Sequence, residues 1–436
     1  MSRAPSLELG PRLERLLPAY LGRQRWFAGK EPAKVDVTSA DNILDTMLWM
    51  VVDTDGGRYQ VVVGAAPSDH PPDFLKGHDD EVLGEVDDLV AFDAVLDPDM
   101  ARALLKKVVP DEAARWVRPI GADQSNSSLV FDDRLVLKLF RRLHPGPNPE
   151  VEITTALAER GYEHVAEPRG VWRHEGMDLA TCQRYLYGGA EGWALALTSL
   201  RDFYASKVDE PGEAGGDFAA EAHRLGQVTA SMHVALADAF GTEEADPQAW
   251  CEAIEEQLGR LEKGDIDRDA ASAFLERLSG VKDPGAAVRI HGDYHLGQVM
   301  RTDHGWFILD FEGEPARPLE ERRKPMSPFK DVAGMARSFQ YASHVVLTER
   351  DEVEQPVLRP RAEAWEGRNR TAFLNGYLRM DGIDALLPGN ADDRQAVLTA
   401  FELDKAVYEV LYERAHRPHW VSIPIQAIRR MLDGKQ

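Results

Sequence analysis

The chain has 436 residues, which is too long for one hydrophobic core and predicts two or three packed units. Its formal net charge of −23, from 51 basic and 74 acidic side chains, argues against nucleic acid or an anionic membrane as a partner. Two cysteines give no disulfide framework, and no apolar run has the length of a signal-peptide core or a membrane span. We therefore expect a protein of the reducing cytoplasm.

The first hundred residues alternate between helical and strand patterns. Leucines at helical spacing predict a short amphipathic helix over residues 6–21. Alternating apolar residues between about 34 and 64, with a turn at Asp55-Gly56-Gly57, predict a small antiparallel sheet. Residues 83–106 return to helical spacing, so we expect a helix there. These elements predict a small α/β domain at the amino end.

A second group of strands begins near residue 112. We expect strands at 116–119, 128–131, 135–140 and 180–187. Lys138 lies inside the apolar run LVLKLF, where an uncompensated ammonium group would be costly. Glu152, on the helix that follows, is well placed to supply an anion. The alternative is that Lys138 reaches water from an edge strand.

The loop of residues 121–128 is rich in small polar residues. Its hydroxyl and backbone N–H groups suit a phosphate, and we select Ser125, Ser127 and Ser128 as candidate contacts. Serine- and asparagine-rich loops are more often loops only, and a GxGxxG pattern is missing. Beyond residue 188 the pattern is mainly helical, with a long amphipathic helix from Asp217 to Ala239. In that helix we interpret Met232 as a core residue and His233 as a surface residue.

Residues 290–314 carry the most specific pattern. Asp293, His295 and Gln298 lie on one short turn, and an apolar run then ends at Asp310. Asp303-His304-Gly305 is a good hairpin turn, which would return Asp310 to the same cleft. Phosphoryl transfer needs one carboxylate to accept the proton of the attacking hydroxyl and a second, with a neutral oxygen ligand, to hold Mg²⁺. Asp293 fits the first role, and Asp310 with Gln298 fits the second.

These motifs resemble a known family. HGDYHLGQ followed by LDFEGE is similar to the aminoglycoside phosphotransferase-like kinases, which are distant relatives of protein kinases. The Gln form with DFEGEP, together with RQRWFAGK near the start and YEVLYE and HRPHW near the end, resembles the actinobacterial maltokinase group. The resemblance implies an α+β, bilobal protein-kinase-like fold with an N-terminal α/β cap domain.

The resemblance also implies roles for further residues. Lys138, oriented by Glu152, would bind the phosphates of ATP, and the strand end from Gln183 to Tyr187, with Gln183 and Tyr185 selected as contacts, would offer backbone groups to adenine. Asp331 would brace the catalytic loop. The basic segment 315–328 would either close over the transferring phosphate or neutralise nearby acids; both readings stay open.

The helix predicted over Phe401–His416 is the candidate acceptor site. Carboxylates and aromatic rings that project together are what sugar recognition uses. We therefore assign substrate contacts to Asp293 and His295 of the loop and to Glu409, Tyr412, Glu413 and Trp420 of this region. The alternative is an ordinary surface helix with internal Glu/Lys pairs.

We predict three domains, a cap at 1–110, an amino-terminal kinase lobe at 111–188 and a mainly helical lobe at 189–436. The predicted function is Mg²⁺- and ATP-dependent phosphorylation of a small-molecule sugar by a monomer. Departures from the family pattern at Tyr294 and Gln340 favour glucosamine as the acceptor. The alternatives are a maltokinase that makes maltose 1-phosphate, an aminoglycoside phosphotransferase and a non-catalytic pseudokinase.

Overall fold

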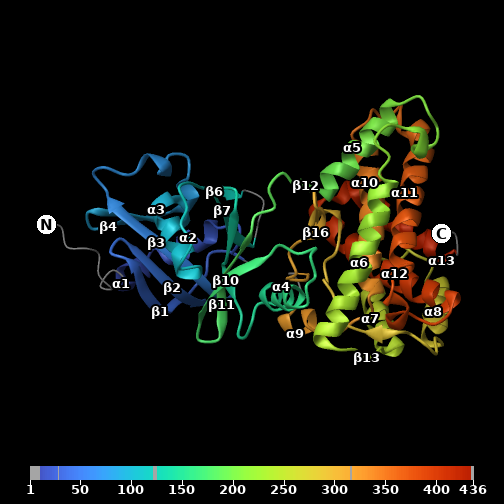
Figure 1. The fold of residues 1–436 in the computed structure, drawn as a ribbon, viewed down its shortest axis with the longest axis horizontal. Helices are drawn as coiled ribbons and strands as arrows, with labels where there is room; N and C mark the ends of the chain where they lie inside the picture. The colour runs from blue at the N-terminus through green and yellow to red at the C-terminus, as the bar shows by residue number, and fades with distance from the viewer. Residues whose placement is uncertain (1–9, 28, 121–124, 315–316, 434–436) are drawn as a thin grey trace. The chain divides into compact units, whose positions relative to one another are not determined.

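The protein is described by a computed structural model that covers residues 10–27, 29–120, 125–314 and 317–433 (Figure 1). Its contacts form two compact units. Unit 1 comprises Met1–Thr155 and Ala166–Tyr187, and unit 2 comprises Ala156–Val165 and Gly188–Gln436. The three-domain division, with boundaries at 110 and 188, stays a prediction. In the described ranges no helix combines the length and apolar character needed to cross a bilayer.

The first sheet of unit 1 is antiparallel and is buried on both faces. Its strand order is β1-β2-β3-β5-β4, and β9 pairs with the start of β3. Along β2 and β3, alternate side chains enter two different cores, for example Trp49 one core and Met50 the other. The strands are β1 (Val35–Leu44), β2 (Met47–Thr54), β3 (Gly57–Pro67), β4 (Val82–Val86), β5 (Leu89–Asp93) and β9 (Arg142–Leu143).

The helix predicted over residues 83–106 is wrong for its first half. That half is the β4–β5 hairpin, whose turn residue Asp87 has a φ of 54°, a left-handed conformation that aspartate tolerates. Only then does α3 (Pro98–Val108) begin, where the Asp97 carboxylate accepts hydrogen bonds from two N–H groups of its first turn. Residues 6–9 of the helix predicted over 6–21 lie outside the described residues, and the rest forms two short helices, α1 (Gly10–Leu13) and α2 (Leu17–Arg23).

The second sheet of unit 1 carries Lys138 on its central strand. The antiparallel order is β10-β11-β8-β7-β6, so Lys138 does not reach water from an edge strand. The first core of the cap sheet continues into this sheet through residues such as Leu137 and Cys182. The sequence analysis missed β10. The elements are β6 (Val117–Ile120), β7 (Asn126–Phe131), β8 (Leu135–Phe140), β10 (Pro168–His174), β11 (Met177–Arg184) and, packed beside them, α4 (Pro149–Glu159).

Unit 2 is mainly helical, with α6 packed along α11 and α10 packed against α11 and α12 (Figure 1). The helices are α5 (Gly192–Ala205), α6 (Ala219–Phe240), α7 (Pro247–Gly259), α8 (Arg268–Ser279), α9 (Leu319–Arg322), α10 (Phe329–Thr348), α11 (Gln355–Leu378), α12 (Ala391–His416) and α13 (Ser422–Leu432). Two small antiparallel sheets complete it, β12-β15-β16 and β13-β14. Their strands are β12 (Ala190–Glu191), β13 (Glu243–Glu244), β14 (Ala286–Ala287), β15 (Val299–Thr302) and β16 (Gly305–Ile308).

The predicted hairpin turn at Asp303-His304 is confirmed, because Thr302 pairs with Gly305 across it. The interpretation of His233 as a surface residue is wrong. Its side chain is fully buried in α6, with Nδ1 2.9 Å from the Tyr377 hydroxyl and Nε2 3.1 Å from Asp331. A buried imidazole with both nitrogens in hydrogen-bond range of partners is a structural residue.

Candidate active site

The loop after β14 carries the predicted base and is held by the first turn of α10. Asp331 of that turn accepts hydrogen bonds from the backbone N–H groups of His291 (2.8 Å) and Gly292 (2.9 Å). Burial by itself would raise the pKa of Asp331, but the hydrogen bond from His233 leads the contributions that lower it. Asp331 therefore braces the loop as a carboxylate, which confirms its predicted structural role.

The same loop is packed closely against the helices. The hydroxyl of Tyr294 lies 2.8 Å from Thr229 Oγ1 in the core, and a Cβ at Gly334 would come within 2.5 Å of the Tyr294 carbonyl oxygen. Gln340 is also buried, and its side-chain oxygen accepts a hydrogen bond from Arg337. Both side chains are buried and hydrogen-bonded, and the preference for an amino sugar that the sequence analysis drew from them stays a prediction.

Gln298 and Asp310 lie next to each other, as the hairpin predicts. Gln298 ends the single turn η6 (Leu296–Gln298), and its side-chain nitrogen donates to Asp310 Oδ2 at 3.2 Å. The backbone N–H of Leu309 also donates to the Gln298 carbonyl oxygen at 2.9 Å. Asp310 has a φ of 59°, which turns the chain sharply after β16. An amide oxygen beside a carboxylate is a donor set that fits Mg²⁺, whose other ligands are commonly water and phosphate oxygens.

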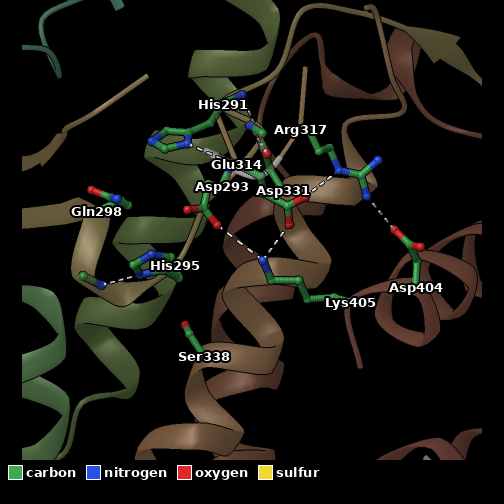
Figure 2. Close-up of polar contacts among 12 residues, drawn as sticks. His291, Asp293, His295, Gln298, Glu314, Arg317, Asp331, Ser338, Asp404 and Lys405 are labelled. Carbon is green, nitrogen blue, oxygen red and sulfur yellow. Dashed lines mark hydrogen bonds and ion pairs between the residues drawn. The ribbon is translucent and has the colours of Figure 1, made fainter. Parts of the chain in front are cut away.

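Lys405 of α12 links the predicted base to a second carboxylate. Its Nζ lies 3.3 Å from Asp293 Oδ1 and 2.9 Å from Glu314 Oε1, as Figure 2 shows. On the other side of Glu314, Arg317 Nε lies 2.6 Å from Oε2, and Arg317 also approaches Asp404 at 3.8 Å (Figure 2). Asp293 therefore belongs to a chain of alternating charges, of which the sequence analysis selected neither Lys405 nor Glu314 nor Asp404.

The ionisation of this chain is set by the charges, not by burial. Burial alone would raise the pKa of Glu314, but Lys405, Lys330 and Arg317 lower it to about 2. Burial alone would lower the pKa of Lys405, but the Glu314 and Asp293 carboxylates raise it above its ordinary value. Both groups are thus charged at neutral pH, and Lys405 stays an ammonium beside Asp293.

A pocket opens between the loop and α12. It encloses about 340 Å³ of empty space, part of it open to solvent, and we call it the α12 pocket. Residues Phe401, Asp404, Lys405 and Tyr408 face it from α12, at the i, i+3, i+4, i+7 spacing of one helical face. The remaining lining residues are Gly292, Asp293, Tyr294, Glu314, Arg317, Lys330 and Gly334. That spacing was the sequence signal that could have found Asp404 and Lys405.

Glu409 and Glu413, which the sequence analysis assigned to the acceptor, are buried and ion-paired, and their contact with an acceptor stays a prediction. Glu409 accepts from Arg337 at 3.0 Å, and Glu413 pairs with Arg417 at 2.8 Å. Glu413 is 1% exposed, so its carboxylate is committed to the interior of the helical unit. Glu409 directly follows pocket-lining Tyr408 in α12, and Glu413 lies one further turn along the helix.

Tyr412 and Trp420 also have partners on their rings. Tyr412 stacks on His416 at 4.4 Å between ring centroids, and the Arg417 guanidinium lies 4.3 Å from the Trp420 ring centroid. Neither lines the α12 pocket, although Tyr412 is partly exposed. Tyr408, which does line it, was not among the residues selected from the sequence.

His295 is positioned by the loop itself. Its Nδ1 accepts from the Gly297 N–H at 3.0 Å, so a neutral ring carries its proton on Nε2. Burial lowers the pKa of His295, and the charge of Asp293 raises it in part. Substrate contact by His295 stays a prediction.

In unit 1 the ion pair of Lys138 is with Glu150. Lys138 Nζ lies 2.7 Å from Glu150 Oε2, and the two side chains are 12% and 4% exposed. The sequence analysis chose Glu152, two residues further along α4, and did not select Glu150; the role of Glu152 stays a prediction. The sequence did indicate correctly that Lys138 needs a carboxylate from the following helix.

The three serines differ in orientation. Ser128 lies opposite Lys138 in the β7–β8 register, on the same face of the sheet. Ser127 faces the opposite side, where its hydroxyl accepts from Arg141 Nε at 2.8 Å, and its contact with phosphate stays a prediction. Ser125 Oγ accepts from the Asn126 side chain, and residues 121–124 of the predicted phosphate loop lie outside the described residues.

The predicted adenine strand is the end of β11. Gln183 lies in the β11 ladder opposite Val136, and the Tyr185 N–H donates to the Arg134 carbonyl oxygen at 2.8 Å. The Tyr185 hydroxyl accepts from Arg118 at 3.0 Å. Adenine contacts from these residues stay a prediction.

For the basic segment 315–328, one of the two hypotheses was that its basic side chains neutralise nearby acids. The contacts of Arg317 with Glu314 and Asp404 agree with that hypothesis.

Comparisons with known proteins agree with this geometry. The phosphotransferase enzyme family matches residues 116–314, and the maltokinase N-terminal cap domain matches residues 20–97. A glucosamine kinase of Mycolicibacterium smegmatis is 31% identical over 338 residues, covering 74% of this chain and 81% of the relative. A glucosamine kinase of Streptacidiphilus jiangxiensis is 30% identical over 338 residues, covering 72% and 73%.

Solved structures show the same fold. A glucosamine kinase in complex with glucosamine, ADP and inorganic phosphate has a TM-score of 0.66 at 22% identity, over 98% of this chain and 99% of its own. A second crystal form of a glucosamine kinase has a TM-score of 0.65 at 23% identity, over 94% and 96%. The predicted kinase-like fold with an N-terminal cap is thereby confirmed.

Proposed function

This chain belongs to the phosphotransferase enzyme family, and from that premise we propose that it is an ATP-dependent sugar kinase whose acceptor is glucosamine. Family membership confirms the predicted phosphotransferase class. Both curated relatives are glucosamine kinases, and each is about as similar to this chain as the other. Their shared activity is the ground for choosing this acceptor.

The single observation that carries the mechanism is the pairing of Asp293 with Lys405 at the wall of the α12 pocket. Asp293 accepts the proton of the attacking sugar hydroxyl, and its carboxylate is held in one orientation by Lys405 Nζ at 3.3 Å. The mechanism is positioning and charge neutralisation, with no covalent enzyme intermediate. Glu314 holds Lys405 in turn, at 2.9 Å.

Gln298 and Asp310 would hold Mg²⁺, which neutralises developing charge on the phosphates when bound. In unit 1, Lys138 would bind the nucleotide phosphates. Glu150 would orient its ammonium, because a buried carboxylate at 2.7 Å fixes the end of an otherwise flexible side chain. The end of β11, through Gln183 and Tyr185, would receive adenine.

One observation favours a second acceptor. The amino-terminal match is to the cap domain of maltokinases, so maltose phosphorylated to maltose 1-phosphate is the second candidate. The charges lining the α12 pocket do not exclude a neutral sugar, because three acids there face three bases. The choice between glucosamine and maltose as the acceptor is therefore tested by measuring turnover with each sugar.

The test is ADP release with Mg-ATP and a panel of glucosamine, N-acetylglucosamine, glucose, maltose and kanamycin. We expect the highest kcat/KM with glucosamine, and Asp293→Asn should lower kcat by about 100-fold or more. Asp303→Asn, in the exposed turn of the β15–β16 hairpin, is the matched control and should keep wild-type turnover. Preference for maltose would replace the acceptor, and silence across the panel would favour a pseudokinase.

A further inference from the structure

Two charged side chains in the α12 pocket lack a close partner. The ammonium of Lys330 has no hydrogen bond or ion pair within the described part of the chain, although it lines the pocket from α10. Among the described residues the cation that approaches Asp404 within ion-pair range is Arg317, at 3.8 Å and beyond hydrogen-bond distance, while Lys330 and Lys405 act on its charge from farther away. By contrast, Glu314 in the same pocket has cations at 2.6 and 2.9 Å.

The charged form of each of these two groups is disfavoured where it lies. Burial lowers the pKa of Lys330, and burial raises the pKa of Asp404. A half-buried charge without a hydrogen-bonded partner lowers stability, whereas the same charge in a cavity gains a partner when a polar ligand enters. Lys330 and Asp404 therefore have the features of groups that a ligand completes.

The other carboxylates of the pocket have less to offer a cationic ligand. Glu314 accepts from both Lys405 and Arg317, and Asp293 is shared between Lys405 and the acceptor hydroxyl that it deprotonates. An incoming ammonium at either place would compete with a lysine or arginine that is already bound. At Asp404 it meets a carboxylate with unused hydrogen-bonding capacity, so the gain there is largest.

We propose that Asp404 and Lys330 form the acceptor-recognition pair, in which the Asp404 carboxylate binds the C2 ammonium of the sugar and Lys330 donates to a neighbouring hydroxyl oxygen. The assignment rests on the proposed function, since it names the groups that select the amino sugar. It places recognition one helical turn before Glu409, the residue selected from the sequence.

The first variant is Asp404→Asn, which keeps the side-chain shape and removes its charge. Because a hydrogen bond between two charged groups is the stronger kind, KM for glucosamine should rise about 10- to 100-fold with kcat changed less than about threefold. Glucose differs at C2 by a neutral hydroxyl, so its KM, or its inhibition constant if turnover is slow, should change less than about threefold. An equal change for both sugars, or none, would overturn the assignment of the ammonium.

The second variant is Lys330→Met, which removes a donor that both sugars use. KM should rise by a similar factor for glucosamine and glucose, because the same hydroxyl oxygen accepts from Lys330 in both sugars. A lower Tm with unchanged KM would show that Lys330 serves stability, against the proposal. This variant also decides the matter if Asp404→Asn does not fold.

Glu402→Gln is the control, since Glu402 is a buried carboxylate of the same helix that pairs with Arg370 away from the pocket. It should lower Tm and leave the ratio of the two KM values unchanged. A wild type that ignores glucosamine would refute the proposed function and the ammonium assignment together. A wild type that uses glucosamine, with the Asp404→Asn variant behaving as the wild type does, would refute only the inference.

Discussion

Lys405 illustrates how one side chain can organise a reaction site. Its ammonium stands between Asp293 and Glu314, so it neutralises two carboxylates that would otherwise repel each other in a partly buried place (Figure 2). Glu314 is 5% exposed and has a second cation in Arg317. The ionised Glu314 carboxylate therefore stabilises the folded state through these two cations. The free energy of unfolding should depend on whether Glu314 is ionised.

We expect the ionisation of Glu314 to stabilise the fold in a defined pH window. Its pKa is lowered from 4.5 to about 2, so its contribution is fully present above pH 4.5 and is lost as the pH falls towards about 2. The full loss is on the order of 3 kcal/mol. Urea unfolding of the wild type and Glu314→Gln between pH 6 and pH 3 should show the gap in unfolding free energy narrowing as the pH falls. Glu320→Gln, on the exposed side of α9, is the control, and a constant gap would contradict the prediction.

At the scale of elements, the catalytic loop takes its position from three helices. Asp331 at the start of α10 binds two loop N–H groups and contacts His233 of α6, which in turn contacts Tyr377 of α11. Ser338, two turns further along α10, accepts from the Leu296 N–H at 3.2 Å. The loop is thus tied to packed helices at both ends, which is the support that a general base needs.

Asp331→Asn should therefore impair turnover more than binding. The amide keeps one acceptor oxygen but loses the charge and the second acceptor, so the loop is held less firmly. We expect kcat to fall at least about tenfold with a smaller change in the acceptor KM, and Tm to fall because a buried charged network is broken. Steady-state kinetics with thermal unfolding would measure both. Asp351→Asn, in the exposed segment after α10, is the control and should change neither kcat nor Tm. A wild-type kcat for Asp331→Asn would show that Asp331 does not position the catalytic loop.

At the scale of the molecule, the cap sheet and the second sheet of unit 1 fold as one body. The fully buried Arg141, which follows β8, pairs with Asp93 of β5, and Tyr20 donates to the same carboxylate at 2.8 Å. Gln60 of β3 donates to backbone carbonyl oxygens of Phe140 and Leu179 in the second sheet. A shared apolar core and buried polar bonds of this kind argue against separate folding of the two sheets.

Asp93→Asn should destabilise all of unit 1 together. Removal of one partner leaves the Arg141 charge buried, which costs roughly 3–5 kcal/mol. Calorimetry should show Tm falling by several degrees without a separate transition for the cap. Asp53→Asn breaks the more exposed pair with Arg58 in the same sheet and should cost less than about 1 kcal/mol. A separate early transition for residues of the cap would contradict the single-body account.

The sequence by itself determined the parts of the site that depend on local spacing. The order of Asp293, Gln298 and Asp310, with a two-residue turn between the second and third, was enough to predict that Gln298 and Asp310 meet. A lysine inside an apolar strand was enough to predict a carboxylate partner for Lys138. Short-range geometry and the cost of a buried charge act within a few residues, so sequence spacing records them.

Only the tertiary structure decided which face of a helix lines the site and which strands pair with each other. Helix α12 is polar on more than one side, so its sequence did not distinguish pocket-facing Asp404 and Lys405 from Glu409, whose carboxylate pairs with Arg337. The choice of Glu150 over Glu152 as the partner of Lys138 has the same cause. The β4–β5 hairpin was predicted as a helix because the spacing of its apolar residues fits both the helical period and the strand period. Its pairing within the sheet, β4 with β5 and β5 with β3, makes it a strand pair. Rotational phase and strand pairing are set by distant parts of the chain, and for that reason local pattern did not determine them.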